Sequence, residues 1–330
     1  MITDRVAVII AAMNASATIG CAVASALADR HVAEVIVVDD ASSDDTGGAA
    51  RAADDGTGRL IILRQDCNTG PAAARNRALD ACTAPLVAIL DADDFLLPGR
   101  FAALLAAPDW DFAADDIVFV PAERADEALP AFASKAPRVT RLGTVEFVEG
   151  NISRRGHARG EIGFLKPVMR TSFLEAHGLR YREDLRLGED YEFYVRALMA
   201  GARYVVVHNC GYAAVVRGDS LSGRHSTQDL RQLWLAGAAL AAGAEAGPVK
   251  AMLERHARHI HGRYVLRDFL DRKARKGLFS AGLESLSQPR SVPAIVSGVA
   301  RDKLDALARR VRPPVQNQGL RTLSEGWPVG

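Results

Sequence analysis

Three clusters of carboxylates in this sequence have the types and spacing that metal binding and proton transfer require. In the first cluster, Asp39 and Asp40 directly follow the apolar run Val35–Val38. Adjacent residues at the end of a strand point to opposite sides of the chain, so one carboxylate of the pair can accept hydrogen bonds from a nucleobase N–H or from ribose hydroxyls. Capping of the following helix is the alternative role, and it suits Asp44 and Asp45 well.

The second cluster is Leu90-Asp-Ala-Asp-Asp-Phe95, which follows another apolar run. Its three carboxylates repel one another, and a divalent cation relieves that repulsion. Mg²⁺ and Mn²⁺ prefer oxygen ligands, and Mg²⁺ typically takes one or two carboxylates together with substrate phosphates. A DxD element is common in acidic turns, but its place after a strand makes it more specific. We predict a metal–diphosphate site with ligands from Asp91, Asp93 and Asp94.

The third cluster is Leu187-Gly-Glu-Asp-Tyr-Glu-Phe193, which opens a helix predicted over Glu189–Ala200. Acids at a helix N-terminus are stabilised by the helix dipole, so capping is the alternative role. An enzyme that activates a hydroxyl needs a base to take its proton. We predict that one of these acids is exposed and aimed at such a hydroxyl.

A glycine–proline break lies between the first two clusters, in the segment Asn68–Arg77. Gly70 permits a tight turn, and Pro71 suits the first turn of a helix. Arg75 lies on that helix, where its guanidinium can reach a nucleotide or its phosphate. A surface ion pair between Arg75 and the acidic loops is the alternative.

These clusters need elements that bring them together, and the first half of the chain alternates strand and helix patterns. Strands are expected over Val6–Ala11, Val35–Val38, Leu60–Leu63, Leu86–Leu90 and Ile117–Val120. Helices are expected over Ala17–Ala28 with Ser16 as its cap, from Asp44 or Asp45 to Ala53, and over Pro71–Cys82 and Pro98–Ala106. This alternation implies βαβ units and an α/β fold with a mostly parallel sheet flanked by helices.

Ligands of such sheets bind beyond the carboxyl ends of the strands. The residues that follow the predicted strands are Ala11–Asn14, Asp39–Ser42 and Asp91–Asp94. We therefore expect these three loops to meet at one edge of the sheet and to carry the chemistry.

The second half of the chain is expected to end in helices. Lys166–Met169 and Tyr204–Val207 read as strands, and the pattern is helical beyond Thr227. Val292–Arg312 places apolar residues near helical spacing with Arg and Lys between them. We predict an α/β catalytic domain over residues 1–226, a helical region over 227–312, and a flexible tail over 313–330.

The charges are distributed unevenly along the 330 residues. The formal net charge of +1 excludes a globally basic nucleic-acid binder, so no nucleic-acid partner is expected. Met1–Pro130 holds 21 Asp or Glu and 9 Lys or Arg, which suits a metal site. Ala251–Arg312 holds 14 Lys or Arg and 6 Asp or Glu, which suits an anionic membrane surface or a solvated helical face. His256, His259 and His261 lie among arginines, which disfavours a metal there.

The cysteines and the N-terminus indicate a reducing compartment. Cys21, Cys67, Cys82 and Cys210 have no zinc-ligand or CxxC spacing, so free thiols are expected. The N-terminus lacks a basic segment followed by a long apolar core, so no signal peptide is expected. Leu233–Ala244 is too short to span a bilayer. We expect a cytoplasmic protein, with peripheral contact at the inner face of the membrane as the alternative.

Five motifs in order resemble one family. They are Val8-Ile-Ile-Ala-Ala-Met-Asn14, Val37-Val-Asp-Asp-Ala-Ser42, Asn68…Gly70…Ala74-Arg-Asn76, Asp91-Ala-Asp-Asp94 and Gly188-Glu-Asp190. Each motif is weak alone, but the ordered set is similar to the family 2 inverting glycosyltransferases with the GT-A fold. The resemblance covers roughly Val6 to Ser222. It implies a GT-A-type, Rossmann-like fold, a UDP-sugar donor and Mn²⁺ or Mg²⁺.

The resemblance also implies residue roles. Asp39 and Asp40 would contact the nucleobase and ribose. Asp91 and Asp93 would form the DxD element, with Asp93 or Asp94 closest to the metal. Asp190 would be the catalytic base, with Glu189 as the alternative. The donor-binding set expected from the motifs is Ala11, Met13, Asn14, Asp39, Asp40, Asn68, Gly70, Arg75, Asp91, Ala92, Arg217, Ser220 and Ser222.

The chain departs from the family pattern at the first loop. The family often has Pro-Thr-Tyr-Asn there, whereas this chain has Ala11-Ala-Met-Asn14, so Met13 replaces an aromatic that would stack on the base. A methionine can still pack on a ring. The family's later Ser-x-Ser element appears as Ser220-Leu-Ser222 after Arg217, where phosphate contacts or a mobile loop are the two interpretations.

The whole chain resembles bacterial exopolysaccharide transferases of the succinoglycan type, which add glucose to a lipid-linked oligosaccharide. The expected reaction is a single displacement that moves a hexose from UDP-glucose to a saccharide acceptor with inversion. A nucleotidyltransferase would normally show a Gly-rich basic loop after the first strand, and a dehydrogenase would show GxGxxG; Ala11–Asn14 is neither. An inactive nucleotide-sugar-binding protein is the non-enzyme alternative. The oligomeric state is left open, with a dimer among the alternatives.

Overall fold

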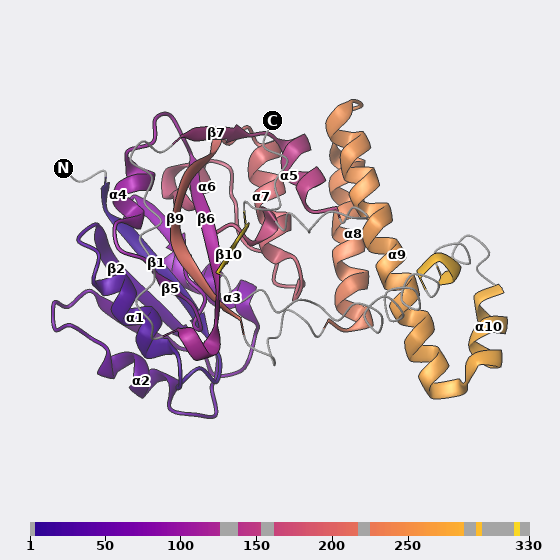
Figure 1. The fold of residues 1–330 in the computed structure, drawn as a ribbon, viewed down its shortest axis with the longest axis horizontal. Helices are drawn as coiled ribbons and strands as arrows, with labels where there is room; N and C mark the ends of the chain where they lie inside the picture. The colour runs from indigo at the N-terminus through magenta and orange to yellow at the C-terminus, as the bar shows by residue number, and fades with distance from the viewer. Residues whose placement is uncertain are drawn as a thin grey trace. The chain divides into compact units, whose positions relative to one another are not determined.

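The computed structural model describes residues 4–125, 138–152, 162–216, 225–286, 295–298 and 320–323. The chain divides into two compact units. The first comprises residues 1–220 together with 320–330, and the second comprises residues 221–319. The first unit has an α/β fold built on one sheet, and the described part of the second unit is helical (Figure 1).

The first unit is organised around one sheet with the strand order β3-β2-β1-β4-β8-β6-β9-β5. The strands are β1 (Val6–Ala12), β2 (Val32–Asp39), β3 (Leu60–Arg64), β4 (Leu86–Ile89), β5 (Phe95–Leu96), β6 (Phe112–Pro121), β7 (Val139–Leu142), β8 (Val168–Arg170), β9 (Tyr204–Val216) and β10 (Arg321–Thr322). The four strands β3-β2-β1-β4 are parallel, as the alternating pattern predicts.

The other half of the sheet is mixed, so antiparallel strands join the mostly parallel sheet that the sequence predicts. β8 lies between β4 and β6 and runs antiparallel to both. β6 and β9 are parallel to each other, whereas β5 and β7 pair antiparallel with β9. β6 and β9 are also longer than the predicted runs. Residues 90–94, called the DxD loop below, connect β4 to β5, and β5 pairs with β9, so the loop ends beside β9.

Helices pack around this sheet. In the first unit they are α1 (Ile19–Leu27), α2 (Thr46–Ala52), α3 (Pro71–Ala81), α4 (Arg100–Leu105), α5 (Thr144–Gly150), α6 (Thr171–Ala176) and α7 (Glu189–Met199). The segment Val6–Ile10 of β1 is fully buried, as expected for a strand covered on both faces. α3 packs on β1 and β2, and α4 packs on β6 and β9.

Two helix starts differ from the expectation, whereas α3 and α7 begin at the predicted Pro71 and Glu189. Thr18, not Ser16, precedes α1, and no side chain caps that helix. The backbone N–H of Ser16 instead donates to Asp44 (3.0 Å). α4 begins at Arg100 after Gly99, which has a left-handed backbone (φ 81°). Asp45 caps α2 as predicted, because its carboxylate accepts from the Gly48 N–H (3.1 Å).

The predicted tail over residues 313–330 needs correction within its described part. Arg321 and Thr322 form β10, which pairs antiparallel with β6. The Arg321 guanidinium also lies 4.4 Å from the centre of the Phe119 ring, and Leu323 is buried. These residues therefore complete the sheet of the first unit.

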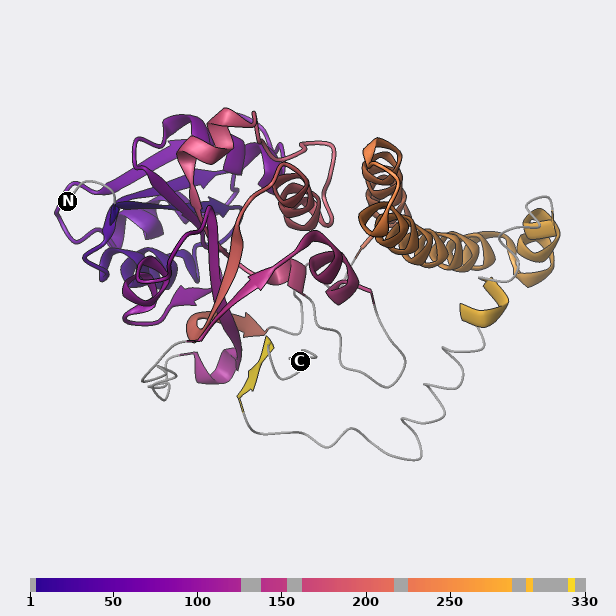
Figure 2. The ribbon, with the colours of Figure 1, turned by 90° about the horizontal axis from the view of Figure 1, so that it is seen from above.

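In its described part, the second unit consists of α8 (Thr227–Gly243), α9 (Pro248–Lys276), α10 (Leu278–Leu286) and the helical turn 295–298. Ser226 and Asp229 form a reciprocal capping box at the start of α8. α8 and α9 run side by side (Figures 1 and 2), and Gly237 of α8 faces Ala257 of α9. Most of the predicted helix Val292–Arg312 lies outside the described residues. None of the helices that the structure describes is long and apolar enough to cross a membrane.

Candidate active site

The three predicted loops meet at the carboxyl ends of β1, β2 and β4. The Asp40 N–H donates to the Ala12 carbonyl (2.8 Å), and the Leu90 N–H donates to the Ile9 carbonyl (2.9 Å). The loop after β1 therefore lies between the loop after β2 and the DxD loop. This arrangement confirms the shared edge that the strand pattern predicts.

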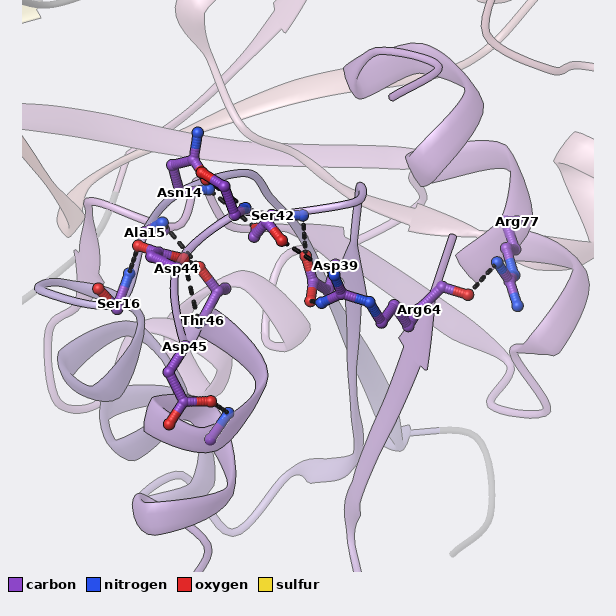
Figure 3. Close-up of polar contacts among 12 residues, drawn as sticks. Asn14, Ala15, Ser16, Asp39, Ser42, Asp44, Asp45, Thr46, Arg64 and Arg77 are labelled. Atoms are coloured by element: carbon purple, nitrogen blue, oxygen red, sulfur yellow. Dashed lines mark hydrogen bonds and ion pairs between the residues drawn. The ribbon is translucent and has the colours of Figure 1, made fainter. Parts of the chain in front are cut away.

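The first and second loops are interlocked through Asn14 (Figure 3). Asn14 has a left-handed backbone (φ 51°), and its N–H donates to Ser42 Oγ (2.9 Å). Its side-chain oxygen accepts from the Ser43 N–H (2.8 Å). The Ala15 N–H donates to Thr46 Oγ1 (2.9 Å). Asn14 thus fixes how the loops after β1 and β2 lie against each other, and these loops form the rim of the site. Contact between Asn14 and the donor remains a prediction.

Asp39 and Asp40 are almost completely buried, with 1% and 4% exposure, and their carboxylates bind protein groups. Asp39 accepts from the Ser42 N–H (2.9 Å) and forms an ion pair with Arg64 (Figure 3). Asp40 accepts from the N–H groups of Thr69 and Gly70, each at 2.8 Å. In this structure the pair ties the ends of β2 and β3 to the loop before α3. Direct contact with a nucleoside remains a prediction.

The loop before α3 has the predicted turn. Gly70 has φ 91°, a conformation that a side chain would strain, and Pro71 is the first residue of α3. Asn68 is exposed, and its amide nitrogen contacts Met13 Sδ (2.6 Å). The Met13 side chain is 52% exposed. Met13 and Asn68 therefore lie together at the rim, where a nucleobase could pack.

The centre of the site is a cluster of three carboxylates and two cations. Arg75 donates to Glu189 (2.9 Å) and Asp190 (2.9 Å) with one nitrogen and to Asp91 (3.0 Å) with another. Lys166 Nζ lies 2.9 Å from oxygens of both Asp190 and Asp91. The cluster joins α3, the DxD loop, the segment before β8 and the N-terminus of α7. It therefore brings the predicted base and the predicted DxD element together.

Lys166 was not among the residues predicted from the sequence. Its segment, Lys166–Met169, reads as a strand of apolar residues, and a charged residue at its start is easily attributed to a strand end. The structure instead buries the side chain, with 5% exposure for the residue. A lysine at the edge of an apolar run is the one signal that could have marked it, because buried lysines need acidic partners.

The charges of the cluster shift its pKa values. The protein around Asp91 disfavours its charged form, but the nearby cations of Lys166 and Arg75 outweigh this effect and lower the pKa to about 2. Burial also disfavours the charged form of Lys166, yet the charges of Asp190 and Asp91 raise its pKa above the usual range. Burial and the charge of Asp190 raise the pKa of Glu189. Asp91 and Lys166 are therefore held in their charged forms.

Tyr212 of β9 holds the DxD loop against the sheet through its hydroxyl group. The Tyr212 hydroxyl donates to Asp94 Oδ2 (2.7 Å) and accepts from the Asp91 N–H (3.1 Å). The other oxygen of Asp94 accepts from the Val215 N–H (2.8 Å). Burial and the charges of Asp91 and Asp93 raise the pKa of Asp94 to about 7. Of the three predicted metal ligands, Asp94 is thus the one that anchors the loop to the sheet.

A buried ion pair supports both the tyrosine and the lysine. Arg100 is 1% exposed, and its Nε donates to Asp115 (3.0 Å). Its guanidinium lies 5.3 Å from the centre of the Tyr212 ring and donates to the backbone carbonyl of Lys166. Arg100 therefore positions Tyr212, which holds the DxD loop, and Lys166. Lys166 in turn contacts Asp91 and Asp190.

The remaining predicted residues are placed as follows. Ala92 is buried within the DxD loop, and Asp93 is partly exposed. Ala11 is the penultimate residue of β1. Arg217, Ser220 and Ser222 lie outside the described residues. Within the described ranges, no group of three or more His, Cys, Asp or Glu side chains is arranged to hold a metal by itself.

The sequence matches known proteins over most of its length. The model of the glycosyl transferase family 2 matches residues 7–175. The succinoglycan biosynthesis protein ExoU of Rhizobium meliloti is 53% identical over 301 residues, which are 91% of this chain and 88% of ExoU. The succinoglycan biosynthesis protein ExoO of the same organism is 34% identical over 219 residues, which are 65% of this chain and 61% of ExoO.

Solved structures share the fold. TarS of S. aureus in complex with UDP-GlcNAc superimposes with a TM-score of 0.58 at 20% identity, covering 88% of this chain and 79% of TarS. The mannosyltransferase PcManGT of Pyrobaculum calidifontis, in complex with GDP-Man and Mn²⁺, superimposes with a TM-score of 0.53 at 19% identity, covering 94% and 88%. The fold is therefore the GT-A fold. The family match favours a sugar transferase over a nucleotidyltransferase, and this chain belongs to glycosyl transferase family 2.

Proposed function

We propose that this glycosyltransferase moves glucose from UDP-glucose to a lipid-linked saccharide during exopolysaccharide synthesis. The observation that carries the proposal is the position of Asp190, 2.9 Å from the same Lys166 ammonium that contacts Asp91 of the DxD element. A base and a diphosphate site must lie on either side of the anomeric carbon in a single displacement. The names of the relatives ExoU and ExoO support the pathway.

The donor would bind across the rim of the first three loops. Met13 is exposed beside Asn68 and can pack on the nucleobase. The buried Asp39 and Asp40 would act mainly by holding the surrounding N–H groups and loops in place. Structures of TarS with UDP-GlcNAc and of PcManGT with GDP-Man support a nucleotide sugar as the donor.

The carboxylates of the DxD loop fit Mn²⁺ or Mg²⁺. Both oxygens of Asp94 bind Tyr212 and Val215. The two oxygens of Asp91 bind Arg75 and Lys166, whereas Asp93 is partly exposed. Asp93 would therefore be the first ligand of the ion, joined by Asp91 and donor phosphates. When bound, the ion supplies positive charge that stabilises the leaving diphosphate.

Asp190 would act as the base of the displacement. Its carboxylate takes the proton of the acceptor hydroxyl, whose oxygen attacks the anomeric carbon from the face opposite the diphosphate. A new glycosidic C–O bond forms, the bond between the anomeric carbon and the phosphate oxygen breaks, and the configuration inverts. Arg75 and Lys166 orient Asp190 through hydrogen bonds of 2.9 Å each. Glu189, 2.9 Å from Arg75, is the alternative base.

The remaining expectations complete the proposal. The protein would work in the cytoplasm, with peripheral contact at the inner face of the membrane where a lipid-linked acceptor is presented. Its oligomeric state, including a dimer, would be read from its mass in solution.

Calorimetry of UDP binding, with and without Mn²⁺, tests the donor site. We expect binding to the wild-type protein that strengthens with Mn²⁺, and loss of that metal effect in Asp93→Ala. The matched control is Asp80→Ala, because Asp80 is an exposed acid on α3 away from the cluster. Release of UDP from UDP-glucose with acceptor then separates an active transferase from an inactive binding protein. UDP binding without any release would favour the inactive alternative.

A further inference from the structure

The outer face of α10 exposes large apolar side chains in the second unit. Leu278, Phe279 and Leu283 are 62%, 83% and 55% exposed. Phe279 and Leu283 are one helical turn apart and so share a face. The opposite face of α10 packs on α9 through Ala281, which is completely buried and lies in one apolar cluster with Phe269 of α9. α10 is thus anchored on one side and apolar on the other.

This concentration of exposed apolar surface is unusual. Scattered exposed apolar residues are normal in folded proteins, but neighbouring ones mark interaction sites. Val296, in the turn that packs beside α10 on α9, is another exposed apolar residue at 62%. The exposed apolar side chains of α10, Leu278, Phe279 and Leu283, are called the α10 face below.

Cations border the α10 face. α9 carries nine Lys or Arg and three Asp or Glu, and its last turn contains Lys273, Arg275 and Lys276, all exposed. Only Gly277 separates this turn from Leu278. Lys276 Nζ also bonds Glu284 Oε1 (2.7 Å), the neighbour of Leu283, so the basic end of α9 lies alongside α10 (Figure 1).

We propose that the α10 face and the basic end of α9 dock onto an anionic lipid surface. Apolar side chains that enter the boundary between headgroups and acyl chains, flanked by Lys and Arg that bind lipid phosphates, are the chemistry of a helix lying on a membrane. A second copy of the chain would bring two surfaces of like charge together, and this repulsion disfavours self-association. The proposal gives the peripheral membrane contact a defined surface and depends on no residue of the catalytic unit.

Vesicle sedimentation of the full-length protein tests the proposal. The probes are vesicles of phosphatidylcholine alone and of phosphatidylcholine mixed with phosphatidylglycerol. We expect binding to the anionic vesicles that is on the order of tenfold tighter than to the neutral ones and that weakens with salt. Phe279→Ser/Leu283→Ser and Lys273→Glu/Arg275→Glu should each weaken it by about tenfold.

Matched controls keep the test specific. Leu235→Ser removes an exposed leucine from α8, and Arg255→Glu/Arg258→Glu makes the same charge change in the first half of α9, away from its basic end. Both should retain wild-type binding. Calorimetric UDP binding in all variants reports whether the catalytic unit is intact, so failure of the donor site and failure of membrane docking are distinguishable.

Two results would overturn the proposal. One is equal vesicle binding by the wild type and Phe279→Ser/Leu283→Ser. The other is a wild-type dimer that this variant converts to a monomer while vesicle binding stays the same, since the α10 face would then pair with a second copy.

Discussion

Lys166 donates a hydrogen bond from Nζ to Asp190 Oδ2 across 2.9 Å, inside the protein. The same ammonium contacts Asp91 at 2.9 Å. Two carboxylates that would repel each other are therefore held by a shared cation, with Arg75 as a second one. This arrangement sets the distance between the residue proposed as the base and the element proposed to bind the diphosphate.

Lys166→Met should destabilise the protein because it leaves Asp91 and Asp190 with one cation fewer in a buried site. Removing one partner of a buried ion pair typically costs about 3 to 5 kcal/mol. The free energy of unfolding in urea measures this. The control is Arg182→Met, which breaks an exposed pair with Asp184 (2.6 Å) and should cost less than about 1 kcal/mol. Equal losses in the two variants would mean that Lys166 makes no special contribution.

Asp190→Asn should lower kcat by about 10² to 10⁴, because asparagine keeps a carbonyl acceptor but cannot take a proton. UDP affinity should change little, since the side chain keeps its size. Steady-state kinetics and calorimetry together measure the two effects. Glu189→Gln serves as the comparison and should retain most activity. The reverse pattern would assign the base to Glu189.

Tyr212→Phe should loosen the DxD loop without disrupting the fold. The change removes the hydroxyl that joins Asp94 to the Asp91 N–H, and a lost buried hydrogen bond costs about 1 to 3 kcal/mol. We expect weaker Mn²⁺-dependent UDP binding by calorimetry and a lower free energy of unfolding. Tyr264→Phe in α9 removes a hydroxyl from a ring stacked on Trp234 (5.8 Å) and should leave UDP binding as in the wild type. Unchanged UDP binding in Tyr212→Phe would argue against its positioning role.

The four cysteines are thiols outside any disulfide, as the sequence predicts, and should divide into two reactivity classes. Burial raises the pKa of Cys82 to about 11. Because the thiolate is the reactive form, only about one Cys82 in a thousand is reactive at pH 8, and its rate should rise roughly tenfold per pH unit up to that pKa. Cys21 and Cys67 are exposed and should react first. Iodoacetamide labelling followed by peptide mapping measures the order.

Donor binding should protect one of the exposed thiols. Cys67 precedes Asn68, which lies at the proposed nucleobase rim, whereas Cys21 lies on α1. UDP with Mn²⁺ should therefore slow the labelling of Cys67 and leave Cys21 unchanged. Equal labelling of Cys67 with and without UDP would place the nucleobase elsewhere.

The sequence by itself determined the parallel half of the sheet and the loops at its edge. The apolar runs of β1, β2 and β4, the Gly70–Pro71 break and the acids after each strand are local signals, because strand burial, turn conformation and helix capping depend on neighbouring residues. The parallel order then places the carboxyl ends of these strands together. These local signals were sufficient to predict Asp91, Asp190 and Arg75 as residues of the site.

Only the tertiary structure decided how those residues are held. Tyr212 meets Asp94 across 118 positions, Lys166 meets Asp190 across 24, and β10 returns to pair with β6. The antiparallel insertion of β8 between β4 and β6 brings Lys166 and the DxD loop to the same place. Such contacts leave no periodic trace in the sequence, because they depend on which strands become neighbours and on the need of each buried charge for a partner of opposite sign.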